Sequence, residues 1–245
     1  MVIEQPNLSI IEKEIFIAKK IKNKLSHKTN NNVKKLEIRD NMRVIIKRCI
    51  DIMSGIVGCI LLIPITIFIG LSNIINKDNG PIFFTQKRIG QNGKVFNMYK
   101  FRTMVVGAED ILKKHLDEQT DIGKEYLEHK KIKNDPRITK VGKFLRATSL
   151  DEFPQFLNVM KGEMSLVGPR PYLLGEKEDM GEYYDFIVKM KPGVTGPWQV
   201  AGRNNLEFDD RLKLDKEYFD RRGNKRDINI ILKTFKKVIK REGAI

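Results

Sequence analysis

A run of 25 residues without a charged side chain, from Ile52 to Asn76, constrains this chain more than any other feature. It reads IMSGIVGCILLIPITIFIGLSNIIN. A helix of about 20 apolar residues is long enough to cross the hydrocarbon core of a bilayer, and core helices of soluble proteins usually have shorter apolar runs. The run therefore predicts a helix inserted in a membrane rather than a buried helix of a soluble domain.

Two features of this run argue against a simple crossing. Pro64 lies near its middle, where proline removes a helical hydrogen bond and favours a kink. Basic residues flank both ends: Arg43, Lys47 and Arg48 precede the run, and Lys77, Lys87 and Arg88 follow it. Basic flanks tend to stay in the cytoplasm. A helix that enters, bends at Pro64 and leaves by the same face satisfies both features, and a straight crossing remains the alternative.

The overall composition is that of a globular chain with an anionic partner. Hydrophobic residues make up 41% and charged residues 31%, and the formal net charge is +15. The charge suits nucleic acid, a phospholipid surface or a phosphorylated substrate. No helix-turn-helix, zinc-finger or RNP-like pattern occurs, and the uncharged run is out of place in a nucleic-acid-binding protein, so we expect no nucleic-acid partner.

The cysteine and histidine residues indicate no special chemistry. Cys49 and Cys59 have no CxxC spacing, and we predict that both are buried thiols in a reducing compartment. The three histidines stand apart and have no metal-ligand spacing, so no zinc site is expected.

The remaining elements follow from local patterns. Residues 1–40 are polar, with a predicted short amphipathic helix and a predicted linker at 29–32. Two β-rich stretches flank Gln91-Asn92-Gly93 and predict a hairpin. Helical patterns follow in a charged, exposed segment and in two shorter ones, at 108–133, 141–147 and about 152–161. The many Pro and Gly residues of 162–203 predict compact loops rather than long elements.

The C-terminal segment has a basic amphipathic pattern. Apolar residues recur at i, i+3, i+4, i+7, i+10 and i+11, at Ile228, Ile231, Leu232, Phe235, Val238 and Ile239. Lysines and Arg241 fill most of the other face. Such a helix can lie in an anionic membrane surface or pack on the core of the domain, and the pattern favours both equally.

Two adjacent carboxylates, Asp151 and Glu152, stand just before a predicted helix. Ser149 and Glu152 match a capping box, which would give the acids a structural role. Pro154 argues against that register, because it would be the fifth helical residue and proline is favoured only in the first turn. The helix should then begin nearer 151–153, with both carboxylates beside free N–H groups that can also receive phosphate.

Four basic residues stand in settings that suit phosphate binding: Lys100, Arg102, Arg146 and Arg170. A guanidinium group binds phosphate through two parallel hydrogen bonds. Proline on both sides of Arg170 fixes its backbone, which a merely solvated charge does not need. We therefore predict these four as phosphate-binding residues, with Lys100 as the weaker candidate.

Several motifs occur together in one order: KRCIDI, QKRIGQNGKVFNMYKFRTM, DPRITKVGKFLRATSLDEFPQFLNVMKGEMSLVGPRP and KPGVTGPWQVAGRN. From about Lys47 to the C-terminus, the chain resembles the bacterial sugar transferases called monotopic phosphoglycosyl transferases, which act on undecaprenyl phosphate. The resemblance implies a mixed α/β, mostly helical fold. It combines a re-entrant membrane helix, bent at Pro64, with a small cytoplasmic catalytic domain that has a β-hairpin and amphipathic interfacial helices. The family commonly has Ser before this proline, whereas Ile63 stands here.

The resemblance also implies how the chain is divided and where it works. A polar extension at 1–40 precedes the membrane segment at 41–78, and a membrane-associated catalytic domain follows at 79–245. The expected location is the bacterial cytoplasmic membrane, with the catalytic domain on the cytoplasmic face and in contact with membrane lipid. Whether the protein forms a homodimer is left open by the resemblance.

The same resemblance implies a sugar-1-phosphate transferase that starts exopolysaccharide, capsule, O-antigen or glycoprotein glycan synthesis. Asp151 would attack the β-phosphorus of a UDP-sugar donor and release UMP, and a polyprenol phosphate acceptor would then take the sugar phosphate from the aspartyl intermediate. Mg²⁺ or another divalent cation would neutralise the diphosphate, with Asp151 and Glu152 as metal ligands. Glu152 as a base remains an alternative. The donor sugar is left open, although 192–203, with Trp198 and Gln199, is a candidate segment for that choice. A membrane-anchored scaffold without catalysis is the rival function.

Overall fold

The computed structural model describes residues 8–129, 132–202 and 206–240, and within those ranges the side chains from Asn41 onward except that of His129. The chain divides into two compact units, Met1–Lys47 and Arg48–Ile245. In the first unit the backbone is helical from Leu8, as the beginning of α1 (Leu8–Ile75). The predicted linker at 29–32 is wrong, because these residues continue the helix. No proline or glycine interrupts 8–40, so nothing in the sequence there breaks a helix.

In the second unit, α1 buries one narrow face and exposes the others. The buried positions recur at i, i+4, i+7, i+11 and i+18, at Asp51, Gly55, Gly58, Leu62 and Ile69. This spacing keeps them on one stripe of the helix. Large apolar side chains on the remaining faces are exposed, and Asn41–Ile75 is long and apolar enough to cross a membrane. The exposed faces of α1 are therefore suited to contact lipid.

The beginning of this stripe is held by polar contacts. The Arg48 guanidinium donates to two carbonyls in the last turn of α5 (Gln155–Lys161), at 3.0 and 3.3 Å. Carbonyls at a helix C-terminus lack intrahelical partners, so this contact satisfies both groups. Asp51 accepts hydrogen bonds from the Ser165 hydroxyl and the next backbone N–H, each at 2.8 Å. These contacts fix α1 to the start of β3 (Ser165–Val167).

The far end of the stripe is held by apolar packing. Leu62 and Ile69 belong to one core cluster with Phe101 and Leu145. Ile82, which follows α1 in the chain, packs against the same cluster. The chain therefore turns back after α1, and both ends of the apolar segment contact the same domain.

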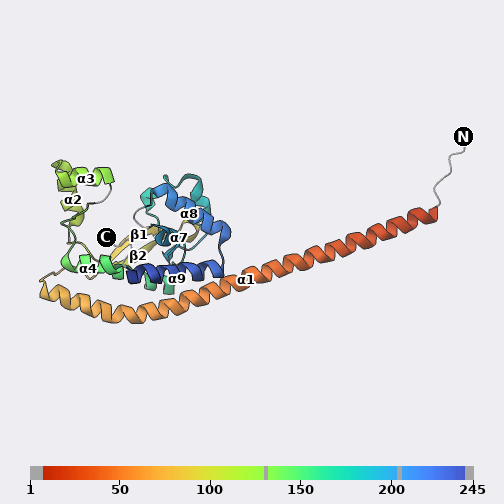
Figure 1. Ribbon diagram of the computed structural model, residues 1–245, viewed down its shortest axis with the longest axis horizontal. Helices are drawn as coiled ribbons and strands as arrows, with labels where there is room; N and C mark the ends of the chain where they lie inside the picture. The colour runs from red at the N-terminus through yellow and green to blue at the C-terminus, as the bar shows by residue number, and fades with distance from the viewer. Residues whose placement is uncertain (1–7, 130–131, 203–205, 241–245) are drawn as a thin grey trace. The chain divides into compact units, whose positions relative to one another are not determined.

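Pro64 lies inside one unbroken helix, and Figure 1 shows α1 curving along this part of its length. Because proline has no N–H, the carbonyl four residues earlier loses its helical donor, which favours bending. The return of the helix to the same membrane face stays a prediction.

Both cysteines are free. Cys49 is exposed and Cys59 is half-buried, so the prediction that both are buried is wrong for Cys49. The reason is its helix: α1 buries only a narrow stripe, and Cys49 lies outside it.

The hairpin predicted around 91–93 is confirmed. Strands β1 (Phe83–Ile89) and β2 (Val95–Phe101) pair antiparallel, and Asn92 and Gly93 adopt left-handed backbone angles in the turn, with φ of 58° and 74°. A second sheet pairs β3 with β4 (Gly193–Thr195) in parallel. Each of these two strands has three residues, which agrees with the prediction of compact loops rather than long elements in 162–203.

The helix predicted at 108–133 is divided into two. Instead of one helix at 108–133, α2 (Ala108–Asp117) and α3 (Asp121–His129) form a helical hairpin. Gln119 interrupts the helix with φ of 50°, and the Thr120 hydroxyl then accepts from the Gly123 N–H in the first turn of α3.

The predicted helices on either side of the carboxylates are present as α4 (Lys140–Thr148) and α5. Short elements follow between β3 and β4, including α6 (Tyr184–Ile187), and then α7 (Pro197–Ala201) and α8 (Phe208–Arg221). The predicted C-terminal helix is α9 (Asn224–Lys240). A mostly helical α/β fold with two small sheets is confirmed.

Helix α9 uses its apolar residues in two ways. Ile230 is buried, and Ile231 packs beside it in the core cluster around Val167 and Tyr218. The apolar residues of the adjoining row stay exposed, at Ile228, Leu232, Phe235 and Ile239. The helix therefore packs on the core and still presents an apolar row to its surroundings.

Candidate active site

Asp151 and Glu152 lie in η2 (Leu150–Glu152), a single 3-10 turn between α4 and α5. Ser149 ends α4 with a left-handed φ of 58° and gives η2 no side-chain cap, so the capping box does not form. Pro154 takes the N-cap position of α5, which begins at Gln155 rather than at 151–153. Because proline has no N–H to donate, it fits this position better than the helix interior.

The apolar neighbours of the carboxylates anchor this turn. Leu150 and Phe153 pack on the cluster that holds the far end of α1. The Glu152 carboxylate forms an ion pair with Lys100 on β2, at 3.0 Å. Helix α1, the hairpin and the carboxylate turn therefore share one core.

The Asp151 carboxyl has an unusually high pKa. Burial is the largest cause and the neighbouring Glu152 charge adds to it, so that the pKa rises from 3.8 to about 6. Lys100 and Arg146 oppose the rise, because both cations favour the ionised form. A carboxylate that is only partly desolvated and faces two cations near neutral pH can act as a nucleophile toward phosphorus.

Arg146 projects from α4 toward this carboxylate. Its Nε donates to the Thr103 hydroxyl at 3.0 Å, and its charge acts on Asp151. Burial lowers its pKa, although an arginine stays charged at neutral pH. Its two terminal nitrogens make no hydrogen bond to any described residue, so they remain able to bind an anion. Thr103, which the sequence did not single out, orients this arginine.

Arg102 is held mainly by contacts that connect neighbouring segments of the backbone. Its guanidinium donates to the Pro81 and Met104 carbonyls at 2.6 and 2.8 Å, and it forms an ion pair with Asp78 at 2.9 Å. These bonds fix the connection between α1 and β1 to the end of β2. Arg102 still lines the same cavity as the carboxylates.

Arg170 lies in a neighbouring cluster. It pairs with Glu176 at 2.8 Å, and its guanidinium lies over the rings of Tyr172 and Trp198, 5.2 and 5.9 Å from their centroids. Its backbone N–H donates to Asp215, a buried carboxyl whose pKa rises to about 7 mainly because of burial. The structure thus places this predicted phosphate ligand against Glu176.

Arg88 connects the two groups and was missed at the sequence level. It is buried, and its charge acts on both Glu152 and Arg170. It donates to the Pro171 carbonyl and to Gln86, and burial lowers its pKa to about 10. The alternation of side chains along a strand could have indicated its position, because Gln86 and Arg88 are two residues apart and so lie on one face of β1.

One cavity of about 2000 Å³ joins most of the predicted site. Five of the six predicted binding and catalytic residues line it, namely Lys100, Arg102, Arg146, Asp151 and Glu152, whereas Arg170 does not. The polar part of this cavity holds adjacent carboxylates beside two cations. This arrangement can bind an anionic, phosphorylated substrate and attack it with a carboxylate.

The two carboxylates are suited to bind a metal ion whose other ligands come from a substrate. Within the part of the chain that the structure describes, no three His, Cys, Asp or Glu side chains gather at one point. Mg²⁺ usually takes one or two protein carboxylates and completes its shell with substrate phosphates and water. Asp151 and Glu152 supply such a donor set at the cavity.

The sequence was compared with known protein families and curated proteins. Residues 42–241 match the family described as bacterial sugar transferase. The chain belongs to this family. Residues of the membrane segment, the carboxylate turn and α9 all fall inside the match.

Several curated bacterial sugar transferases are similar to this chain. An undecaprenyl-phosphate galactose phosphotransferase of Salmonella typhimurium is 43% identical over 81% of this chain and 41% of its own length. The galactosyl transferase CpsE of Streptococcus agalactiae is 46% identical over 82% of this chain and 44% of its own. The chain thus spans less than half of these relatives. The exopolysaccharide production protein ExoY of Rhizobium meliloti is 37% identical over 81% of this chain and 87% of its own.

Proposed function

We propose that this protein transfers a sugar-1-phosphate from a UDP-sugar to undecaprenyl phosphate and so starts the synthesis of a surface glycan. The observation that carries the proposal is Asp151, a half-buried carboxyl with a pKa of about 6, whose charge interacts with Lys100 and Arg146 in a cavity next to an apolar helix. The names of the relatives, which include an undecaprenyl-phosphate galactose phosphotransferase and an exopolysaccharide production protein, support the same reaction class.

The proposed reaction has two displacements at one phosphorus. The Asp151 carboxylate attacks the β-phosphorus of the donor, the bond from that phosphorus to the bridging oxygen breaks, and UMP leaves. The acceptor phosphate oxygen then attacks the same phosphorus, and the bond to Asp151 breaks to restore the carboxylate. Splitting one displacement between two poorly reactive phosphates into two steps is the advantage of a carboxylate nucleophile.

The surrounding residues would bind and orient the phosphates. Arg146 would hold phosphate oxygens through its two terminal nitrogens, and Lys100 would add a second positive charge. Asp151 and Glu152 would hold Mg²⁺, which when bound supplies neutralising charge to the diphosphate. Glu152 either completes this metal site or acts as a base toward the acceptor.

We also propose that α1 enters the membrane from the cytoplasmic face and does not cross it. Arg48 and Asp51 bind the domain at one end of the apolar segment, and Ile69 and Ile82 pack on it at the other. The helix from Asp51 to Ile69 is about 27 Å long at 1.5 Å per residue, close to the thickness of the hydrocarbon core. A straight crossing would therefore draw the charged domain into lipid.

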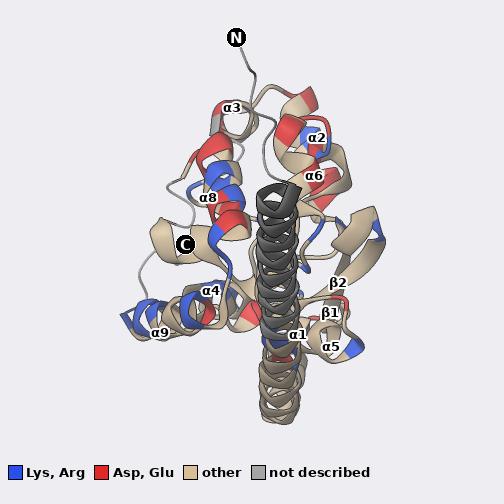
Figure 2. Ribbon diagram, turned by 90° about the vertical axis from the view of Figure 1, so that its right-hand side faces the viewer, with Lys and Arg blue, Asp and Glu red and all other residues tan. Residues whose placement is uncertain are grey.

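Helix α9 supports attachment to the same surface. Its exposed apolar row contains Leu232 and Phe235, and Figure 2 shows lysine and arginine residues along the helix. Apolar side chains beside lysines favour the interface of an anionic membrane. In this arrangement the carboxylate turn lies near the lipid headgroups, where a soluble donor and a lipid acceptor can both reach it.

The proposal is tested with a panel of UDP-sugars, each incubated with purified protein, undecaprenyl phosphate and Mg²⁺ while UMP release is measured. We expect one or a few donors to give UMP together with a sugar-diphosphate lipid. Asp151→Asn should abolish both products, and Asp117→Asn, at an exposed position on α2, should leave them unchanged. Absence of UMP with every donor, or unchanged turnover in Asp151→Asn, would refute the proposed reaction.

A further inference from the structure

The cavity that contains Asp151 and Glu152 continues as an apolar groove. One wall is a row on α1 that includes Met53, Val57 and Leu61, at i, i+4 and i+8. A second apolar wall is contributed by α9, with Phe235 and Val238. Val194 on β4 also lines the cavity.

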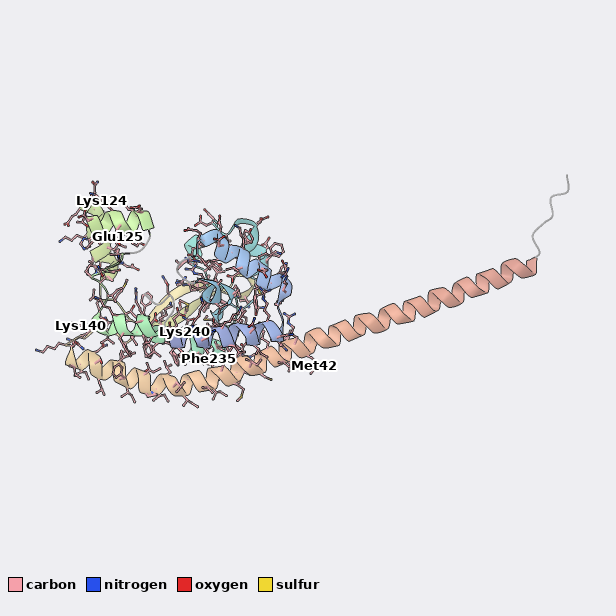
Figure 3. All side chains as sticks on the ribbon, viewed as in Figure 1. Met42, Lys124, Glu125, Lys140, Phe235 and Lys240 are labelled. Carbon is pink, nitrogen blue, oxygen red and sulfur yellow. The ribbon has the colours of Figure 1, made fainter. Side chains whose placement is uncertain are left out.

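Both walls are exposed although they are apolar. Met53 is 63% and Val57 is 53% exposed on α1, and Phe235 is 64% exposed on α9. Figure 3 labels Phe235 on α9, which lies beside α1. Exposed apolar side chains from two helices that line one cavity present an apolar surface that the packing of the described residues does not cover.

The groove is continuous with a cationic end. The same cavity is lined by Lys100 and Arg146, and the charge of Arg146 acts on Asp151. A ligand that fills the whole cavity therefore needs a phosphate at one end and a flexible apolar chain at the other. Neither a nucleotide sugar nor a soluble phosphate has such a chain.

We propose that the groove between α1 and α9, defined by Met53, Val57, Leu61, Val194, Phe235 and Val238, holds the isoprenoid chain of the acceptor. The inference rests on the proposed function and assigns a place to the acceptor within it. The chain lies along the groove, and its phosphate reaches Asp151 from the side of η2. The donor then approaches the carboxylates from the polar part of the cavity, near α2. In Figure 3, Lys124 and Glu125 mark the hairpin of α2 and α3, away from α1.

Photocrosslinking tests this assignment without turnover. Asp151→Asn protein in vesicles of phosphatidylglycerol is irradiated with a polyprenyl phosphate that carries a diazirine near the phosphate end of its chain. We expect labelled peptides from both α1 and α9, and undecaprenyl phosphate in excess should suppress them. Labelling that persists under this competition would show contact with bulk lipid only and would overturn the proposal, as would labelling confined to other segments.

Kinetics of variants give an independent test. Val57→Phe on α1 and Val238→Phe on α9 narrow the groove and keep it apolar. Each should raise the KM for undecaprenyl phosphate about tenfold or more, equivalent to about 1.4 kcal/mol of lost contact. Geranyl phosphate, whose chain is too short to fill the groove, should be much less affected. Ile60→Phe is the matched control, because Ile60 is 61% exposed on α1 but lies outside the cavity lining.

The two half-reactions separate this inference from the proposed function. UMP release without acceptor should be the same in Val57→Phe, Val238→Phe and wild type, because the donor does not use the groove. An equal rise in KM for Ile60→Phe, or no rise in either groove variant, would overturn the acceptor site and leave the donor chemistry intact. Failure of wild type to release UMP would refute the proposed function, while the crosslinking result would still decide whether the groove binds the chain.

Discussion

Replacing Asp151 with Asn should stabilise the folded protein at neutral pH while it abolishes sugar transfer. Burial, and then the charge of Glu152, raise the pKa of Asp151 from 3.8 to about 6. The ionised carboxylate is therefore less favourable in the folded than in the unfolded chain. A shift of about 2 pKa units corresponds to at most about 3 kcal/mol of unfolding free energy.

The gain in stability from Asp151→Asn should depend on pH. The pKa of Asp151 is higher in the folded than in the unfolded chain. The stability that protonated Asp151 gives the wild-type protein is therefore fully present below about pH 4 and is lost as the pH rises through about 6. Asn cannot ionise and avoids this loss. The difference in stability between Asp151→Asn and wild type should be near zero at about pH 4 and reach its maximum above about pH 7.

The thermal midpoint of purified protein in detergent, followed by intrinsic fluorescence across this pH range, measures the difference. For a chain of this size, each kcal/mol shifts the midpoint by roughly 2–4 °C. Comparison of the two proteins at each pH cancels other titrating groups, such as Asp215. Asp117→Asn, which removes an exposed carboxylate, should give a difference that is small at every pH. An Asp151→Asn protein no more stable than wild type above pH 7, or a gain equally large at every pH, would refute the reasoning.

Three further predictions follow from the same contacts. UMP release without acceptor should increase between about pH 5 and pH 7, because Asp151 with a pKa of about 6 must lose its proton before it attacks, and a flat profile would contradict this. Gly58→Ala should lower the thermal midpoint, because the new Cβ would lie 2.1 Å from the Phe156 ring and overpacking costs about 1–3 kcal/mol. Phe156→Ala in the same chain should restore part of that loss, and an unchanged midpoint in Gly58→Ala would show that α1 does not pack there. Asp51→Leu should cost about 1–3 kcal/mol, because it leaves the Ser165 hydroxyl and a backbone N–H without their acceptor, and an equal or higher midpoint would contradict it.

The elements that the sequence predicted well are those specified by local patterns. The turn at Gln91–Gly93 needs residues that tolerate positive φ, and Asn92 and Gly93 supply them. The uncharged run at 52–76 and the periodic pattern of α9 are long enough that tertiary contacts do not override their helical structure. Pro154 does limit where α5 can begin, although the helix starts at Gln155 and not at 151–153, and the catalytic role of Asp151 and Glu152 stays a prediction.

The features that the sequence missed depend on contacts between distant segments. Strands β3 and β4 are three residues each, too short to show a period, and they pair across the intervening segment. Arg88 connects Glu152 and Arg170 only because the hairpin folds beside the carboxylate turn. Arg170 was predicted to bind phosphate from its flanking prolines, but its contact with Glu176 comes from a segment that sequence reasoning treated as loop.

The intact mass of the protein after incubation with a UDP-sugar and Mg²⁺, without acceptor, tests most directly whether Asp151 is the nucleophile. The donor is the one selected from the panel. We predict about one UMP released per protein, a mass increase equal to one sugar phosphate, and a modified peptide that contains Asp151. Asp151→Asn should show neither product, and undecaprenyl phosphate should remove the adduct from wild type. Normal turnover with acceptor but no adduct and no UMP in its absence would contradict the covalent mechanism and favour direct transfer between the two substrates.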